Sequence, residues 1–295
     1  MGRIVVGTSS WADPGFVAEW YPDGLPARDR LGFYAQRFEG VEVNSTWYAL
    51  PGQRAVARWV DQTPEGFTFD WKLHRALSRH AAQVDALPAD LRAAVDTTPK
   101  GRVRLDAVLE AELARRTLEA AAPLVEAGRL SSFLLQLSPA FAPGKHALDE
   151  LDDLVAALAP HPVAVELRHR GWLGRDERER TLGWYEERGA VWVGVDAPQG
   201  KPATLLPPLD AVTDARLAYV RAHGRNLEGW VHGRSVAERF GHRYADDELR
   251  ELVGRAQALS QEAQEVRLVF NNNRGSDAPV AAERARELLG QAVAA

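Results

Sequence analysis

Pairs of charged side chains separated by one residue end several short apolar segments of this chain. Glu166 and Arg168 lie in the segment 163–169, and Arg221 and His223 repeat this spacing in the segment 217–224. A carboxylate or an imidazole can move protons, and a guanidinium offers two parallel hydrogen bonds to a phosphate or a carboxylate. The spacing therefore predicts a site that binds an anion and carries out acid–base chemistry.

Glu42 and Lys72 occupy inward positions of two consecutive predicted strands, 41–46 and 67–74. Adjacent strands lie about 4.8 Å apart, so we expect these two side chains to be near neighbours. One interpretation is a buried ion pair that fixes the strand register. Alternatively, Lys72 is a clamp for phosphate or carboxylate, or an amine whose lowered pKa permits imine chemistry. The sequence leaves these alternatives open.

Eight segments of β-strand character must position these residues, and helical segments separate them. The predicted strands span residues 4–10, 41–46, 67–74, 132–138, 163–169, 190–196, 217–224 and 265–273. Eight strands alternating with helices predict an α/β fold, a parallel (β/α)8 TIM-type barrel whose site lies at the carboxyl ends of the strands. Because strand side chains alternate between faces, one ring of inward polar residues is expected there. Its members are Ser9, Glu42, Asn44, Lys72, His74, Gln136, Glu166, Arg168, Asp196, Arg221, His223 and Asn271.

The connections between these strands complete the predicted fold. Helices are expected over residues 28–38, 53–62, 103–126, 148–158, 176–188 and 246–263, with Asp246 as the last one's N-cap and a short helical turn at 209–214. Long loops are expected after the third strand, where residues 75–102 are a candidate lid, and after the seventh strand. Barrels of this length usually form one domain, so residues 1–295 are predicted to be a single domain.

We assign each candidate residue a role. Four are predicted to be catalytic: Glu42, Lys72, Glu166 and His223. The others are predicted to bind substrate: Ser9, Trp11, Asn44, Tyr48, His74, Gln136, Arg168, Asp196, Arg221, Asn271 and Asn272. Aromatic residues beyond strand ends either pack loops or stack on sugars and bases. Asparagines at such ends either contact a substrate or satisfy the backbone of a turn.

Composition and charge exclude several kinds of site. The chain has no cysteine, so disulfides, cysteine–zinc sites, iron–sulfur clusters and thiol nucleophiles are excluded. A net charge of −5 gives no general basic surface, so a small anionic substrate is favoured over nucleic acid as partner. We predict no cofactor, because three cations in the ring would repel a divalent metal, which is the less favoured alternative. With no apolar segment of about 20 residues and no signal sequence, a cytoplasmic protein without membrane contact is expected.

Several sequence blocks together resemble the domain of unknown function 72 family, also called YecE-like. The most specific is Glu42-Val43-Asn44-Ser45-Thr46-Trp47-Tyr48. Others are Gly7-Thr8-Ser9-Ser10-Trp11, Val165-Glu166-Leu167-Arg168-His169, Tyr219-Val220-Arg221-Ala222-His223-Gly224 and Phe270-Asn271-Asn272. The resemblance runs nearly end to end and implies a (β/α)8 barrel, but no established reaction. The segment 77–80 departs from the family's pattern, which places less weight on His80.

These observations favour an enzyme of the hydrolase, lyase or isomerase class that binds a phosphate- or carboxylate-bearing substrate at the carboxyl face of the barrel. Arg168, Arg221 and Lys72 would hold the anion, and phosphoester or nucleic-acid processing is one version of this function. A second hypothesis is a sugar isomerase or glycosidase-like enzyme that acts on a neutral carbohydrate. A third is a non-catalytic barrel that binds a ligand or nucleic acid.

Overall fold

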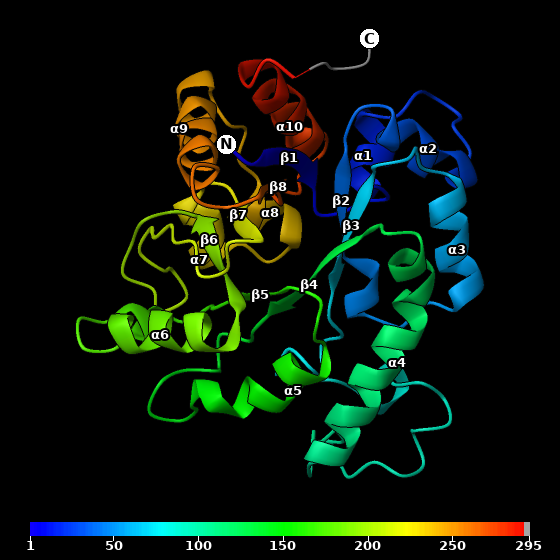
Figure 1. Cartoon of the computed structure of the whole chain (residues 1–295), viewed down its shortest axis with the longest axis vertical. Helices are drawn as coiled ribbons and strands as arrows, with labels where there is room; N and C mark the ends of the chain where they lie inside the picture. Colours follow the sequence, from blue (N-terminus) through cyan, green and yellow to red (C-terminus); the bar gives the residue numbers. More distant parts are fainter. Residues whose placement is uncertain (292–295) are drawn as a thin grey trace.

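Eight parallel strands pair into one sheet in the order β1-β8-β7-β6-β5-β4-β3-β2. They are β1 (Arg3–Thr8), β2 (Gly40–Val43), β3 (Thr68–Lys72), β4 (Leu130–Gln136), β5 (Val163–Glu166), β6 (Ala190–Asp196), β7 (Leu217–Ala222) and β8 (Glu265–Phe270). The computed structural model describes residues 1–291, except for the side chain of residue 236. Helices surround the ring of strands (Figure 1), which confirms the predicted (β/α)8 TIM-type barrel.

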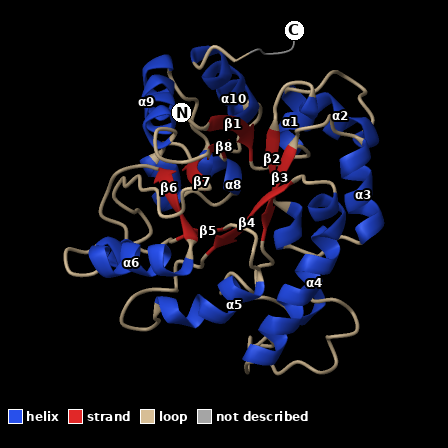
Figure 2. Cartoon of the chain, viewed as in Figure 1, coloured by secondary structure: helices blue, strands red, loops and turns tan. Residues whose placement is uncertain are grey.

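The helices form the outer layer of the molecule (Figure 2). They are α1 (Pro14–Glu19), α2 (Arg30–Ala35), α3 (Gln53–Asp61), α4 (Ala107–Glu126), α5 (Asp152–Ala157), α6 (Arg178–Arg188), α7 (Leu227–His232), α8 (Val236–Phe240), α9 (Asp246–Leu259) and α10 (Asp277–Leu288). Short 3₁₀ helices are η1 (Ala27–Asp29), η2 (Ser45–Trp47), η3 (Val84–Ala86), η4 (Leu148–Leu151) and η5 (Arg170–Leu173). Within residues 1–291, no helix combines the length and the apolar character that crossing a bilayer requires.

Two local predictions are wrong. Residues 209–214 are not helical, because this segment bonds to β6 instead: the Leu209 carbonyl accepts from the Trp192 indole at 2.9 Å, and Thr213 Oγ1 donates to the Ala190 carbonyl at 2.7 Å. The N-cap of α9 is Ala245 rather than Asp246. The Glu248 carboxylate accepts from the Ala245 amide at 2.9 Å, so an acidic side chain in the first turn satisfies the free donor.

Both long loops are present, but they differ from each other. The loop after β3 contains η3 and two isolated antiparallel bridges, Gln83↔Arg102 and Thr97↔Val103. The loop after β7 folds into α7 and α8. Most predicted strands extend two or three residues too far, because the polar residues at their ends already belong to the loops. These residues are thus held at the carboxyl ends of the strands.

At the seam between the edge strands β1 and β2, the hydrogen bonds of a side chain replace the backbone hydrogen bonds that join the other neighbouring strands. The Tyr34 hydroxyl on α2 accepts a hydrogen bond from the Thr8 amide at 2.9 Å and donates to the Gly40 carbonyl at 3.3 Å. The two strands approach so closely that a Cβ atom at Gly7 would lie 2.3 Å from that carbonyl oxygen. Only glycine fits at position 7, because a Cβ atom would clash with this oxygen atom.

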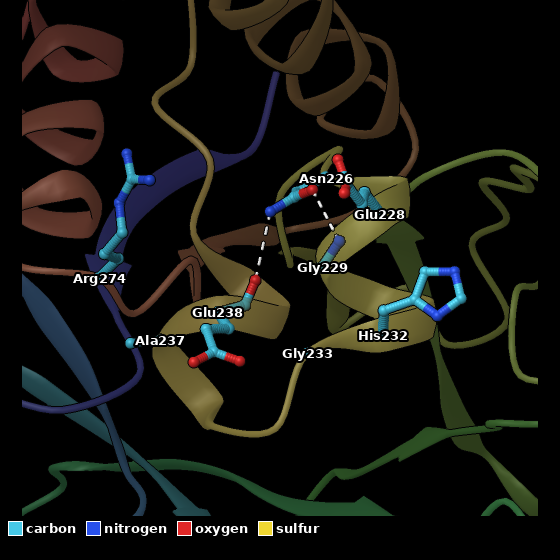
Figure 3. Close-up of a pocket in the computed structure, with 8 residues that line it drawn as sticks. All are labelled: Asn226, Glu228, Gly229, His232, Gly233, Ala237, Glu238 and Arg274. Atoms are coloured by element: carbon cyan, nitrogen blue, oxygen red, sulfur yellow. Dashed lines mark hydrogen bonds between the residues drawn. The ribbon is translucent and has the colours of Figure 1, made fainter.

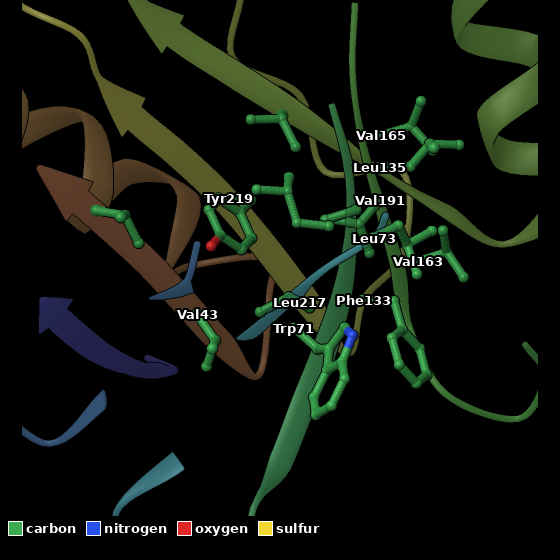
Figure 4. Close-up of a cluster of buried hydrophobic side chains, with 14 of the residues drawn as sticks. Val43, Trp71, Leu73, Phe133, Leu135, Val163, Val165, Val191, Leu217 and Tyr219 are labelled. Carbon is green, nitrogen blue, oxygen red and sulfur yellow. The ribbon is translucent and has the colours of Figure 1, made fainter. Parts of the chain in front are cut away.

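Apolar side chains on the outer faces of the strands pack beneath the helices. Trp71 and Phe133 are fully buried members of this layer, and Figure 4 shows them beside valine and leucine side chains of neighbouring strands. Inside the barrel, Asp70 on β3 forms a buried ion pair with Arg267 on β8 at 3.2 Å. Burial raises the pKa of Asp70 to about 6, although Arg267 opposes the shift. A charged layer therefore lies in the interior of the barrel.

Candidate active site at the carboxyl ends of the strands

Arg221 on β7 joins two carboxylates that come from β2 and β5. Its Nε and Nη2 atoms donate to Glu42 at 2.8 and 2.7 Å, and its Nη1 atom donates to Glu166. The Tyr219 hydroxyl also donates to Glu42, at 3.2 Å. Glu42, Glu166 and Arg221 are completely buried. Arg221 therefore acts as the counter-ion of two carboxylates, and its expected contact with substrate stays a prediction that this geometry does not favour.

Glu166 accepts hydrogen bonds from several side chains besides Arg221. Its Oε1 atom lies 2.9 Å from Gln136 Nε2, 3.1 Å from Arg168 Nη1 and 3.1 Å from His223 Nε2. Burial alone would raise the pKa of Glu166, but Arg221 and His223 outweigh burial and hold it well below its usual range. Glu166 is therefore an ionised anchor, and it orients the side chains that surround it.

His223 lies in a chain of hydrogen bonds that fixes its tautomer. Its Nε2–H group donates to Glu166, while its Nδ1 atom accepts from Asn271 Nδ2 at 2.9 Å. Asn271 in turn accepts from the Ser9 hydroxyl through Oδ1. Burial lowers the pKa of His223 to about 4, although Glu166 opposes the shift. The imidazole is therefore neutral at pH 7, and the structure brings together the predicted residues Ser9, His223 and Asn271.

Lys72 on β3 is buried, with 8% of its surface exposed, yet it lacks an ionic partner. Among residues 1–291, Lys72 Nζ makes no hydrogen bond and has no carboxylate oxygen within 4.0 Å. Of the alternatives left open for Glu42 and Lys72, the ion pair is not formed, because Glu42 is in register with Asp70 and its carboxylate is bound by Arg221. Burial and Arg221 together lower the pKa of Lys72 to about 7, against the opposing effect of Glu42.

Trp47 brings Lys72 together with two further cationic or basic groups. Lys72 Nζ lies 5.6 Å from the indole centroid, the Arg75 guanidinium lies 4.5 Å from it, and the His80 ring is 5.3 Å away. Three nitrogen atoms here are buried and have no hydrogen-bond partner in the part of the chain that the structure describes: Trp47 Nε1, Arg75 Nε and His80 Nε2. Buried polar atoms normally have partners, so their shared location indicates a place where a ligand supplies them.

His80 enters this group through a tight turn after β3. Arg79 adopts a left-handed conformation with φ of 58°, which is uncommon for a residue other than glycine. An ion pair with Glu110 and a hydrogen bond of 2.8 Å to the Glu150 carbonyl hold Arg79 in place. Burial lowers the pKa of His80 to about 4, and Lys72 contributes to this shift. The sequence placed less weight on His80, because the segment 77–80 departs from the pattern of the family that it resembles.

The loop after β7 covers the site with aromatic rings. The Arg168 guanidinium lies 5.2 Å from the ring centroid of Trp230 on α7. The His223 ring is 6.3 Å from Trp230 and 5.9 Å from Phe240 on α8. We call the following residues the mouth cluster: Glu42, Trp47, Lys72, Arg75, His80, Gln136, Glu166, Arg168, Arg221 and His223.

A separate groove lies against α7 and α8, and Figure 3 shows its lining. Asn226 organises it: Oδ1 accepts from the Gly229 amide at 2.9 Å, and Nδ2 donates to the Glu238 carbonyl at 3.2 Å. The lining consists of Asn226, Glu228, Gly229, His232, Gly233, Ala237, Glu238 and Arg274, none of which belongs to the mouth cluster. The groove is therefore a different surface of the covering loop.

Asp196 does not point into the barrel, so its predicted orientation is wrong. Arg221 faces inward and is in register with Val195, which places Asp196 on the opposite face of β6. There Asp196 accepts from the Tyr244 hydroxyl at 2.7 Å and forms ion pairs with Arg225 and Arg255 at 2.9 and 3.4 Å. Its surroundings are a structural network between β6 and α9.

Other predicted binding residues lie at the edge of the cluster or in loop packing. His74 Nε2 lies 3.2 Å from the Ala86 carbonyl, and Asn272 donates to the His242 carbonyl at 2.8 Å. Their substrate contacts stay predictions.

Three more lie around the rim. Trp11 packs edge-on against Trp59 at 5.3 Å, and Tyr48 is 62% exposed beside Trp47. Asn44 has a buried Oδ1 atom without a donor, so it offers an acceptor to a ligand.

The cluster combines locked carboxylates with free cationic and basic nitrogen atoms. Lys72 and Arg168 offer donors, and the neutral imidazole of His80 has an Nε2 atom without a partner within residues 1–291, whereas both ring nitrogen atoms of His223 are engaged by Glu166 and Asn271. Within residues 1–291, no group of three or more histidine, aspartate or glutamate residues is arranged to hold a metal ion. The arrangement can bind anionic oxygen atoms and transfer protons through nitrogen bases.

Comparisons with known proteins agree with the observed fold. The sequence profile described as "Protein of unknown function DUF72" matches residues 5–295. The UPF0759 protein YunF of Bacillus subtilis is 27% identical over 290 residues, which cover 97% of this chain and 94% of that protein. A DUF72 family protein of Enterococcus faecalis has a crystal structure with a TM-score of 0.80 and 27% identity, over 100% of this chain and 97% of that chain. A DUF72 family protein of Thermotoga maritima has a crystal structure with a TM-score of 0.78 and 26% identity, over 98% of this chain and 100% of that chain.

Proposed function

We infer that this chain, which belongs to the DUF72 family, is an enzyme that binds a small phosphate- or carboxylate-bearing substrate at the carboxyl face of its barrel. The observation that carries this inference is the set of donors without acceptors around Trp47 and Lys72. Oxygen atoms of an anion are the partners that such donors require. The reaction class stays open between hydrolase, lyase and isomerase.

The charges of the mouth cluster support an anionic ligand. Glu42 and Glu166 are both neutralised by Arg221 and its neighbours, whereas Lys72 and Arg75 have no carboxylate partner within residues 1–291. Within residues 1–291, Arg168 donates only through Nη1, to Glu166, so its other N–H groups are available. An anion placed between these groups would compensate positive charge that the protein leaves uncompensated.

Arg168 is the residue we assign to the anionic group. Its side chain is 14% exposed, in contrast to the completely buried Arg221. Contact with Glu166 fixes one edge of the guanidinium, and the ring of Trp230 lies beneath it. A planar guanidinium held in this way is prepared for two parallel hydrogen bonds to phosphate or carboxylate.

A neutral carbohydrate is the weaker alternative. Glycosidase chemistry needs two carboxyl groups that flank a sugar, one of them able to donate a proton. Glu42 and Glu166 instead share Arg221 and are completely buried, and the pKa of Glu166 is well below its usual range. The rim aromatics Tyr48 and Trp230 are the features that still favour a sugar.

Thermal unfolding in the presence of ligands tests the anion site. Phosphate, pyruvate and 3-phosphoglycerate should raise the melting temperature of the wild-type protein at millimolar concentration, because ligands that bind only the folded state stabilise it. Arg168→Ala should abolish this rise without unfolding the protein. Arg54→Ala removes an exposed arginine of α3 and should leave the rise unchanged.

Two results would contradict the proposal. One is an equal rise in the Arg168→Ala variant, and the other is stabilisation by neutral sugars alone.

A further inference from the structure

We propose that Lys72 is a nucleophilic amine that forms an imine with the substrate, so that the substrate is an aldehyde or ketone which also carries the anionic group. This inference rests on the proposed function, because the same mouth cluster would hold the anion through Arg168. It adds the reacting atom of the protein, Lys72 Nζ, and the reacting group of the substrate, a carbonyl.

The use of lysine in this chain supports the assignment. Only four lysines occur among the 36 lysine and arginine residues, and the other three, Lys100, Lys145 and Lys201, are exposed. Other buried cations inside the barrel are arginines paired with carboxylates, as in Arg221 with Glu42 and Arg267 with Asp70. Arginine keeps its proton in proteins, whereas a buried lysine can lose it. Lysine therefore occupies the buried position where a free amine would be useful.

The groups that face Lys72 leave its nitrogen atom unbound. Glu42 on β2 and Glu166 on β5 are the carboxylates whose charge acts on Lys72, but Arg221 on β7 engages both. From the loops after β3 and β5, the surrounding groups are His80, Arg75 and Arg168, which are bases or cations. Burial and Arg221 bring the pKa of Lys72 to about 7, so a large fraction of the amine is neutral near that pH. Only the neutral amine is a nucleophile.

Imine formation balances without any added oxidant or reductant. The Nζ lone pair forms a bond to the carbonyl carbon, and the carbonyl π electrons move to oxygen. Both amine protons end on that oxygen, which leaves as water while the C=N bond forms. A neutral imidazole can carry these protons from nitrogen to oxygen. His80 fits this role, since it lies against the same indole ring and its buried Nε2 atom has no partner.

Reductive trapping of the full chain tests the proposal. Protein is incubated with glyoxylate, an aldehyde that carries a carboxylate, and with cyanoborohydride, which reduces an imine to a stable secondary amine. Peptide mapping by mass spectrometry then gives the labelling rate at each of the four lysines. At pH 7.5 we expect Lys72 to be labelled at least tenfold faster than Lys100, Lys145 or Lys201, despite its burial.

The pH profile separates activation from simple access. Labelling at Lys72 should rise up to about pH 7 and then level off, whereas labelling at the exposed lysines should keep rising towards about pH 10. Lys72→Arg should remove the fast label and leave the three slow ones. If Lys72 is labelled no faster than the exposed lysines, or if its rate keeps rising to pH 10, the proposal is overturned.

A neutral aldehyde distinguishes this inference from the anion site. Acetaldehyde should label Lys72 more slowly than glyoxylate, and Arg168→Ala should slow only the glyoxylate reaction. Fast labelling by both aldehydes, without any anion-induced thermal stabilisation, would retain the amine and reject the proposed anion site. Anion-induced stabilisation without preferential labelling of Lys72 would reject the amine alone.

Discussion

Arg221 and Lys72 show how two cations in one cluster take opposite roles. Arg221 donates to Glu42 and Glu166 and is completely buried, so it balances charge inside the protein. Lys72 is nearly as buried but has no such partner within residues 1–291. A buried charge without a partner destabilises the folded state, so its retention indicates a function.

This contrast gives a stability prediction for Lys72→Met. The Lys72 amine has a pKa of about 7 in the folded state and about 10.4 in the unfolded state. Between these pH values the unfolded chain therefore holds an extra proton. Stability should therefore rise with pH across this window, and the penalty is fully present below about pH 7. Methionine removes the charge at similar length, so Lys72→Met should raise the free energy of unfolding at pH 6 by about 2–4 kcal/mol.

Urea unfolding at pH 6 and pH 10 measures this effect, which should shrink at the higher pH. Lys145→Met, at an exposed position, should change the free energy by less than about 0.5 kcal/mol. A loss of stability in Lys72→Met at pH 6 would show that the ammonium group is a structural member of the cluster.

At the residue scale, the sequence predicted which side chains gather but not how they pair. Period-two alternation placed Glu42, Lys72, Glu166, Arg221 and His223 inside the barrel correctly. The partner of Glu42 depends on the reach of Arg221 across the barrel, which no local pattern records.

The predicted inward orientation of Asp196 was wrong for a different reason. Its strand, β6, is buried along its whole length, so alternation gives no signal there.

At the scale of elements, the β1–β2 seam is where the fold is most sensitive. We expect Gly7→Ala to destabilise the protein by about 2–4 kcal/mol, because the new Cβ atom would lie 2.3 Å from the Gly40 carbonyl oxygen. The strands would have to separate, and the Tyr34 hydroxyl could not reach both of them. Denaturant unfolding of the purified variant gives the change.

A second glycine serves as the matched control. Gly254 lies within α9, and a Cβ atom there would meet nothing within 4 Å. Gly254→Ala should stabilise the protein by about 1 kcal/mol, through helix propensity. Equal effects of the two alanine substitutions would refute the steric account of the seam.

Six of the ten helices within residues 1–291 fall in predicted segments, including the six-residue α2 and α5, whereas α1, α7, α8 and the twelve-residue α10 were not predicted. The segments 103–126 and 176–188 contain α4 and α6. The six-residue helices α1 and α7 form because the barrel rim and aromatic packing hold them.

At the scale of the whole molecule, eight alternating strands and helices were sufficient to predict the barrel and the face that carries the site. Parallel strands bring their carboxyl ends to one face, so residues from distant parts of the sequence had to meet there. The covering of this face by α7 and α8, and the entry of His80, depend on tertiary contacts of long loops. Such contacts leave little trace in a single sequence.

The central claim is that the mouth cluster binds an anion, and anomalous diffraction tests it most directly. Crystals of the wild-type protein soaked in selenate should show the selenium peak of an ion whose oxygen atoms accept hydrogen bonds from Arg168 and Lys72, because these donors have free positions to fill. Crystals of the Arg168→Ala variant should lack that peak. Selenate found only at exposed arginines outside the barrel mouth, with none beside Arg168 or Lys72, would contradict the account.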